Sequence, residues 1–156
     1  SRPSTMAVPG QFSKELMQAI LDALDAHHNH SRLVEICFRI LASLSSNGDF
    51  RTLTSKLGGV SKILEAMDRL QEINEVQESG CSVLSALALS YEISSEVLRN
   101  GGRTRILNAM EKNKQHVGVQ REGCRAIRNL ISSSSTLHTN LLSPWGLGFN
   151  VVILTL

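Results

Sequence analysis

Three histidines stand close together near the start of this chain, in the run His27-His28-Asn29-His30. Imidazole nitrogens bind transition metals, so such a cluster is the first place to look for a metal site. The run lies between two segments with helical patterns, and the corresponding stretches further along, residues 70–73 and 113–116, contain no such cluster. We therefore interpret the histidines as part of a solvated loop and predict no metal site.

Three cysteines, Cys37, Cys81 and Cys124, are the second candidates for chemistry. Three thiols cannot all pair within one chain, and their spacing includes no close CxxC pair of the kind that binds zinc. They fall at almost the same position of successive repeats, described below, where a small buried side chain is needed. We expect reduced thiols in the core of a cytosolic or nuclear protein.

Motifs of the common catalytic and nucleotide-binding sites are absent from the sequence. It contains no P-loop, dinucleotide fingerprint, GxSxG or HExxH motif. Carboxylates three residues apart, such as Glu75 and Glu78, are interpreted as solvated helix faces. We expect no enzyme, no cofactor and no small-molecule substrate.

A basic cluster is the third candidate. Arg121, Arg125 and Arg128 are four and three residues apart, which places them on one face of a helix. Residues 97–128 have a net charge of +6, whereas residues 60–96 have −5. Guanidinium groups pair well with carboxylate and phosphate, but the chain has one Trp, one Tyr and a net charge of only +2, which makes nucleic acid a poor partner. We expect an acidic or phosphorylated protein segment instead.

The elements that position these residues recur at intervals of 43 residues. Residues 101–130 reproduce much of residues 58–87 without an insertion, and a fainter copy precedes them. The strongest matches are the pairs Gly59/Gly102, Ile63/Ile106, Leu64/Leu107, Ala66/Ala109, Met67/Met110, Val76/Val119, Gln77/Gln120, Gly80/Gly123 and Cys81/Cys124. A helical period in this range is typical of stacked-helix arrays.

Each copy divides into two amphipathic helices and a short connecting helix. Apolar residues three and four apart predict the amphipathic helices at residues 12–26, 31–44, 60–70, 75–89, 103–112 and 117–132. Short helices are expected at 50–57, 96–100 and 137–142. The glycine pairs 58–59 and 101–102 are expected to supply left-handed residues at helix ends.

Individual residues refine these helices. Asn74 and the pair Ser94-Ser95 are expected to cap helix N-termini. Gly80 and Gly123 sit in helix interiors, where each costs about 1 kcal/mol relative to Ala. They therefore predict close contact between helices.

The two ends of the chain differ from the repeats. Residues 1–10 are expected to be a disordered lead-in without a secretory signal, and no stretch is apolar enough to span a membrane. Residues 11–142 form the repeat domain, with repeats at about 11–57, 58–100 and 101–142. Residues 143–156 are an atypical apolar tail, which needs cover or favours self-association.

The pattern of short helix, glycine turn, second helix and longer third helix resembles the armadillo repeat family. The phrases VQESGCSVLSALAL and VQREGCRAIRNLI resemble its third helix and following turn. Tetratricopeptide repeats have a period of 34 residues, and the GG turn and VQxxGC phrase favour armadillo over HEAT repeats. The resemblance covers residues 11–142. It implies an all-α, right-handed superhelix, an α-solenoid whose third helices line a concave, protein-binding groove.

The resemblance also indicates which side chains face that groove. Peptide-binding members of the family have a Trp and, four residues later, an Asn on each third helix. The Asn positions hold Ser43, Ala86 and Asn129 here, and the Trp positions hold arginine or serine. The predicted groove residues are Arg39, Ser82, Arg121, Arg125, Arg128 and Asn129. Their charge favours an acidic or phosphorylated segment over a basic peptide.

The function implied is that of a non-enzymatic protein–protein interaction scaffold in the cytoplasm or nucleus. An alternative is a regulatory docking segment of a larger multidomain protein such as a kinase. Self-association through open repeat ends is a third hypothesis, because the terminal repeats of a solenoid normally need polar caps.

Overall fold

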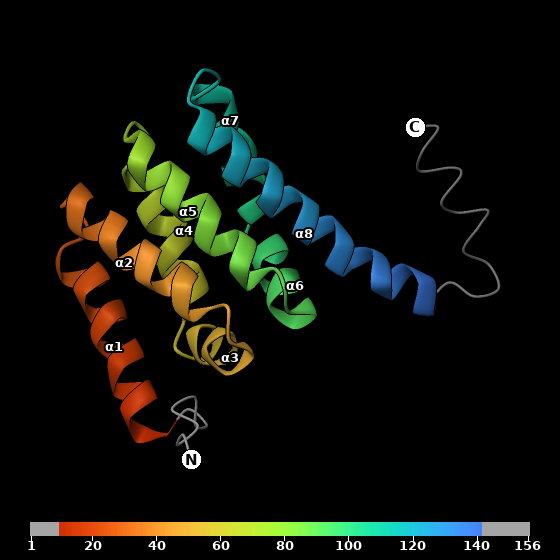
Figure 1. Cartoon of the computed structure of the whole chain (residues 1–156), viewed down its shortest axis with the longest axis horizontal. Coiled ribbons are helices and arrows are strands. Elements are labelled where there is room, and N and C mark those ends of the chain that lie inside the picture. Colours follow the sequence, from red (N-terminus) through yellow and green to blue (C-terminus); the bar gives the residue numbers. More distant parts are fainter. Residues whose placement is uncertain (1–9, 142–156) are drawn as a thin grey trace, which may run out of the picture.

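The computed structural model describes residues 10–141, and every regular element in that range is an α-helix (Figure 1). The helices are α1 (Gln11–Ala26), α2 (Ser31–Leu44), α3 (Gly48–Lys56), α4 (Gly59–Arg69), α5 (Asn74–Leu87), α6 (Tyr91–Arg99), α7 (Gly102–Lys112) and α8 (Val117–Leu141). This confirms the predicted all-α class. None of these helices combines the length and apolar character needed to cross a membrane.

The helices are arranged in three rows. In the first row α5 packs between α2 and α8, in the second α4 packs against α1 and α7, and in the third α3 contacts α6. Figure 1 shows α2, α5 and α8 side by side, with α4 behind α5. The helices of the first row begin at Ser31, Asn74 and Val117, which are 43 residues apart. Residues 43 apart therefore occupy corresponding positions on neighbouring helices.

Two glycine pairs turn the chain between rows. Gly58 and Gly101 have φ of 75° and 78°, the left-handed conformation predicted for them. The second glycine of each pair packs closely. A Cβ on Gly59 would lie 2.5 Å from Thr54 Cγ2, and one on Gly102 would lie 2.3 Å from Val97 Cγ1. Each pair thus supplies one residue for the turn and one for a tight contact.

The mid-helix glycines of α5 and α8 lie against methionines of the second row. A Cβ on Gly80 would lie 2.7 Å from Met67 Sδ, and one on Gly123 would lie 2.5 Å from Met110 Cγ. This confirms the close helix contact predicted at both positions.

Two glutamines, Gln77 and Gln120, join the same pairs of helices. The Nε2 of Gln77 donates to the carbonyl oxygens of Met67 and Leu70, at 3.0 and 3.1 Å. The Nε2 of Gln120 donates to those of Met110 and Asn113, at 2.8 and 2.9 Å. These oxygens belong to the C-terminal turns of α4 and α7, where backbone carbonyls lack a partner within the helix. The two glutamines therefore cap neighbouring helices.

The cysteines do not share one environment. Cys37 and Cys81 are buried, but Cys124 is exposed, so the prediction of three core thiols is wrong for Cys124. Burial raises the pKa of both buried thiols, and for Cys81 burial together with the nearby Glu122 carboxylate raises the pKa to about 12. Cys81 of α5 is buried near Glu122 of α8, whereas no described helix follows α8 in the row to cover Cys124.

The histidine run forms the loop between α1 and α2, as predicted. His30 is the N-cap of α2, and its Nδ1 accepts a hydrogen bond from the Leu33 backbone N–H at 3.3 Å. His28 Nδ1 donates to the Asp25 carbonyl oxygen at 2.8 Å. Within the described part of the chain, no group of three or more His, Cys, Asp or Glu side chains is placed to hold a metal ion.

Two predicted caps are wrong. The N-cap of α5 is Ile73, and Asn74 is the first residue of the helix. Ser94 lies inside α6, where it is buried, and the helix begins five residues earlier than predicted, at Tyr91, after the N-cap Ser90. A serine inside a helix looks like a cap in sequence, because both positions suit a short hydroxyl side chain.

The last helix is also longer than predicted. A break was expected in the run Ser132–Ser135, followed by a short helix at 137–142, but α8 continues without interruption to Leu141. Serine hydroxyls bond back to the helix or to its neighbour. Ser132 Oγ donates to the Arg128 carbonyl oxygen, Ser134 Oγ to that of Ile131, and Ser133 Oγ to that of Ala88. The serines are therefore accommodated in the helix. The predicted tail, residues 143–156, and residues 1–9 of the predicted lead-in lie outside the described residues.

Candidate partner-binding groove

A pocket of about 370 Å³ lies along the first row of helices. Its walls come from α2, α5 and α8, and its lining residues are Glu35, Arg39, Glu75, Glu78, Ser79, Ser82, Arg121 and Glu122. Three of the six predicted groove residues, Arg39, Ser82 and Arg121, are among them. We call this pocket the groove.

The 43-residue spacing explains how these side chains meet. Glu35, Glu78 and Arg121 occupy corresponding positions on α2, α5 and α8, and so do Arg39 and Ser82 on the first two of these helices. The three helices lie side by side (Figure 1), so side chains at corresponding positions line up across the groove. The set at positions 35, 78 and 121 consists of two carboxylates and one guanidinium.

Two of the glutamates are buried between arginines. The Glu35 side chain is only 12% exposed and pairs with Arg32 at 2.5 Å and Arg39 at 3.7 Å. The Glu122 side chain is 7% exposed and pairs with Arg121 Nε at 3.0 Å and Arg125 Nη1 at 3.2 Å. Burying a carboxylate is costly unless it is paired and hydrogen-bonded. The arginines of the predicted site therefore compensate buried charge within the protein.

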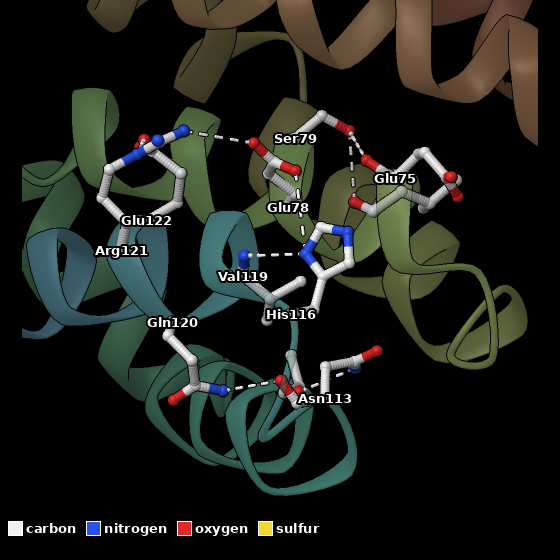
Figure 2. Close-up of polar contacts among 11 residues, drawn as sticks. Glu75, Glu78, Ser79, Asn113, His116, Val119, Gln120, Arg121 and Glu122 are labelled. Atoms are coloured by element: carbon white, nitrogen blue, oxygen red, sulfur yellow. Dashed lines mark hydrogen bonds and ion pairs between the residues drawn. The ribbon is translucent and has the colours of Figure 1, made fainter.

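A third glutamate, Glu78, joins α5 to the start of α8. Its carboxylate lies 3.3 Å from Arg121 Nη2 and 3.9 Å from His116 Nδ1, and Figure 2 shows both side chains directed toward it. His116 Nδ1 also accepts the Val119 backbone N–H at 3.2 Å. Gly118 leaves room for the carboxylate, because a Cβ there would lie 2.2 Å from Glu78 Oε2.

The remaining predicted residues do not line the groove. Arg125 pairs with Glu122, and Arg128 donates to Asn129 Oδ1 at 3.2 and 3.3 Å. Asn129 Nδ2 donates to the carbonyl oxygen and Oγ of Ser85, at 2.9 and 3.1 Å, so it connects α8 to α5. Asn129 also lines a separate, more apolar pocket of about 290 Å³ beside Leu89 and Tyr91.

Sequence reasoning missed five groove residues, Ser79 and the four glutamates Glu35, Glu75, Glu78 and Glu122. Glu75 and Glu78 were interpreted as a solvated helix face, yet both line the groove. Glu35 and Glu78 are 43 residues apart, so the repeat spacing itself could have placed them in one row. The groove lining as a whole has four carboxylates and two guanidiniums.

Charge is also complementary between the second row's helices. Arg105 of α7 pairs with Asp68 of α4 at 2.7 Å, and Lys112 of α7 pairs with Glu72, just after α4, at 2.8 Å. Lys62 of α4 pairs with Asp25 of α1. The basic and acidic parts of the chain therefore meet each other along the array.

Comparisons of this chain with protein-family models, with curated proteins and with solved structures find no match.

Proposed function

We propose that this chain is a right-handed α-solenoid of armadillo-like repeats that acts as a non-enzymatic protein-binding scaffold. The observation that carries the proposal is the groove itself, a pocket shared by three helices that lie side by side and belong to three copies of one pattern. A surface built from corresponding positions of successive helices suits a partner segment that runs across the row.

Recurring contacts support stacked units of one kind. The capping bonds of Gln77 have their counterparts at Gln120, and the left-handed Gly58 has its counterpart at Gly101. The contacts of Gly80 with Met67 recur between Gly123 and Met110. These pairs are all 43 residues apart, and each joins the same types of helix.

Charge in the groove favours a partner segment with a lysine or arginine side chain. The arginines that line it, Arg39 and Arg121, already pair with glutamates, so they have less free charge to offer an acidic segment. Glu75 is exposed and has no ion pair among the described residues, which leaves its carboxylate available. A basic side chain can therefore gain an ion pair there without breaking one. This revises the acidic or phosphorylated partner expected from sequence.

Selection from a display library of random twelve-residue peptides tests the partner class. We expect selected peptides to share at least one lysine or arginine, and Glu75→Gln to weaken their binding about fivefold, corresponding to about 1 kcal/mol for a partly exposed ion pair. Fluorescence anisotropy with a labelled peptide measures this change.

The control is Glu65→Gln, the same charge change on α4, at a residue that does not line the groove. It should leave affinity unchanged. Enrichment of acidic peptides, or tighter binding of phosphorylated ones, would overturn the basic-segment proposal. Selection of no peptide at all would overturn the groove as a protein-binding site.

A further inference from the structure

Two sides of the helix array expose apolar residues at positions that are buried in the other copies. On the α2 side, Ile36 and Ile40 are 38% and 40% exposed, and they line a shallow, largely apolar pocket of about 370 Å³ with Arg39, Ser43 and Leu44. We call this the α2 face. On the opposite side, Leu107 of α7 and Ile131 of α8 are 44% and 61% exposed, and Cys124 of α8 is exposed as well. We call these three residues the α8 face.

Residues that correspond to the α2 face are covered in both later copies. The positions of Ile36 and Ile40 correspond to Ser79 and Val83 of α5, which are 5% and 0% exposed. They also correspond to Glu122 and Ala126 of α8, which are 6% and 0% exposed. In each case the preceding helix of the row packs along that side of the helix.

Residues that correspond to the α8 face are buried in the middle copy. Leu107, Cys124 and Ile131 correspond to Leu64, Cys81 and Ala88 of the middle copy. These are 2%, 0% and 0% exposed, because the following copy covers them. The α8 face is thus one half of a junction that the chain forms twice, between α2 and α5 and between α5 and α8. The α2 face is the other half.

Charge at these positions is complementary in the α5–α8 junction, whereas the α2–α5 junction has a glutamate on both sides, Glu35 and Glu78. In the α5–α8 junction, Glu78 of the earlier helix pairs with Arg121 of the later one. Consider a junction between the α8 face of one molecule and the α2 face of another. Arg121 of the first molecule then stands where Glu78 stands in the α5–α8 junction, and Glu35 of the second molecule stands where Arg121 stands. The pair keeps opposite signs, with the donor and acceptor exchanged.

We propose that the chain binds a second copy of itself head to tail, with the α8 face of one molecule against the α2 face of the next. Such a contact is heterologous, so it leaves one free face at each end of the complex and adds further molecules as concentration rises. The contact places α2 of one molecule beside α8 of the other, so that the first rows of the two molecules continue each other. This self-association is independent of the partner class proposed for the groove.

Two variants, each with one of the two faces blocked, test whether the contact is head to tail. Light scattering with size-exclusion chromatography should show a wild-type mass that rises with concentration beyond a dimer. Ile40→Glu blocks the α2 face and Ile131→Glu blocks the α8 face, so each variant alone should be monomeric. Their equimolar mixture should form a dimer and stop there, because the free α8 face of the first variant meets the free α2 face of the second. Circular dichroism confirms that both variants are folded.

Thiol alkylation provides a test that needs no variant. Cys124 lies on the α8 face, whereas Cys37 and Cys81 are buried, so Cys124 reports coverage of that face. Its alkylation rate should fall at least severalfold as protein concentration rises. Slow alkylation at every concentration would mean that this chain's own residues 142–156 cover the face, and fast alkylation at every concentration would mean that nothing does. Either of these two alkylation results overturns the proposal. In the light-scattering experiment, it is overturned by a wild type that stays monomeric at every concentration or by a dimer that either variant forms alone.

Discussion

Gln77 offers the sharpest test of how the rows are held together. This residue is 3% exposed, and its side chain donates two hydrogen bonds to carbonyl oxygens at the end of α4. Gln77→Met keeps the length and helix propensity of the side chain but removes the donor. The Met67 carbonyl then loses its bond from Gln77, and the Leu70 carbonyl keeps only the Ile73 backbone N–H. At about 1 kcal/mol for each lost bond, we expect a loss of about 2 kcal/mol in the free energy of unfolding. For a chain of this size that corresponds to a decrease in Tm of about 4–8 °C.

Urea unfolding followed by circular dichroism measures the change, with Gln11→Met as the matched control. The amide of Gln11 bonds to Glu15 on an exposed face of α1, so its loss should cost less than about 0.5 kcal/mol. Gln120→Met should have an effect of the same kind but smaller, because Gln120 is only half-buried. If Gln77→Met changes the stability no more than Gln11→Met does, the two hydrogen bonds do not hold α5 to α4 and the reasoning is refuted.

Two further predictions concern packing and titration. Gly102→Ala should lower the free energy of unfolding by about 1–3 kcal/mol, measured in urea, because the new Cβ would lie 2.3 Å from Val97 Cγ1 and 2.9 Å from the Val97 carbonyl oxygen. The control is Gly48→Ala, whose Cβ would meet only the flexible end of Arg51, and which should cost less than half as much. Burial raises the pKa of Cys81 from 9.0 to about 12, so the folded protein keeps that proton while the unfolded chain loses it. The contribution of this pKa shift to the free energy of unfolding is fully present below pH 9 and is lost as the pH rises toward 12. Cys81→Ala should lack this part of the decline when wild type and variant are both unfolded at pH values across that range.

Most of the helical framework could be predicted from sequence, because the positions that repeat are those that pack. Met67 and Gly80 recur 43 residues later as Met110 and Gly123, and the contact within each pair fixes where the second-row helix meets the first-row helix. Helix boundaries were less predictable where serines occur. Serine hydroxyls suit a cap in one context and a helix interior in another. In α8 the hydroxyls of Ser132, Ser133 and Ser134 bond to backbone carbonyls, whereas the buried Ser94 hydroxyl of α6 has no hydrogen-bond partner in the described part of the chain.

The groove was predictable only in part. Arg39 and Ser82, which occupy corresponding positions on α2 and α5, line the pocket together with Arg121 of the basic cluster, whereas Arg125, at the corresponding position of α8, does not. The repeat spacing could not show which carboxylates are buried. Glu35 and Glu122 have the spacing of ordinary surface residues in sequence, and their burial depends on the arginines that flank them in the folded chain.

The charge difference between copies has an internal explanation, which changes how the arginines should be interpreted. Residues of the basic third copy that do not recur in the middle one looked like candidates for partner binding. Arg105 and Arg121, however, pair with Asp68 and Glu78 of the acidic middle copy, and Asn129 bonds to Ser85. Partly exposed ion pairs of this kind contribute at most about 1 kcal/mol each, but opposite charges on facing sides favour one order of neighbours over another. A residue that differs between repeats can therefore serve the junction between those repeats. Among the residues of the groove, the exposed Glu75, which has no ion pair within the described chain, is a stronger candidate for partner recognition than any of these arginines.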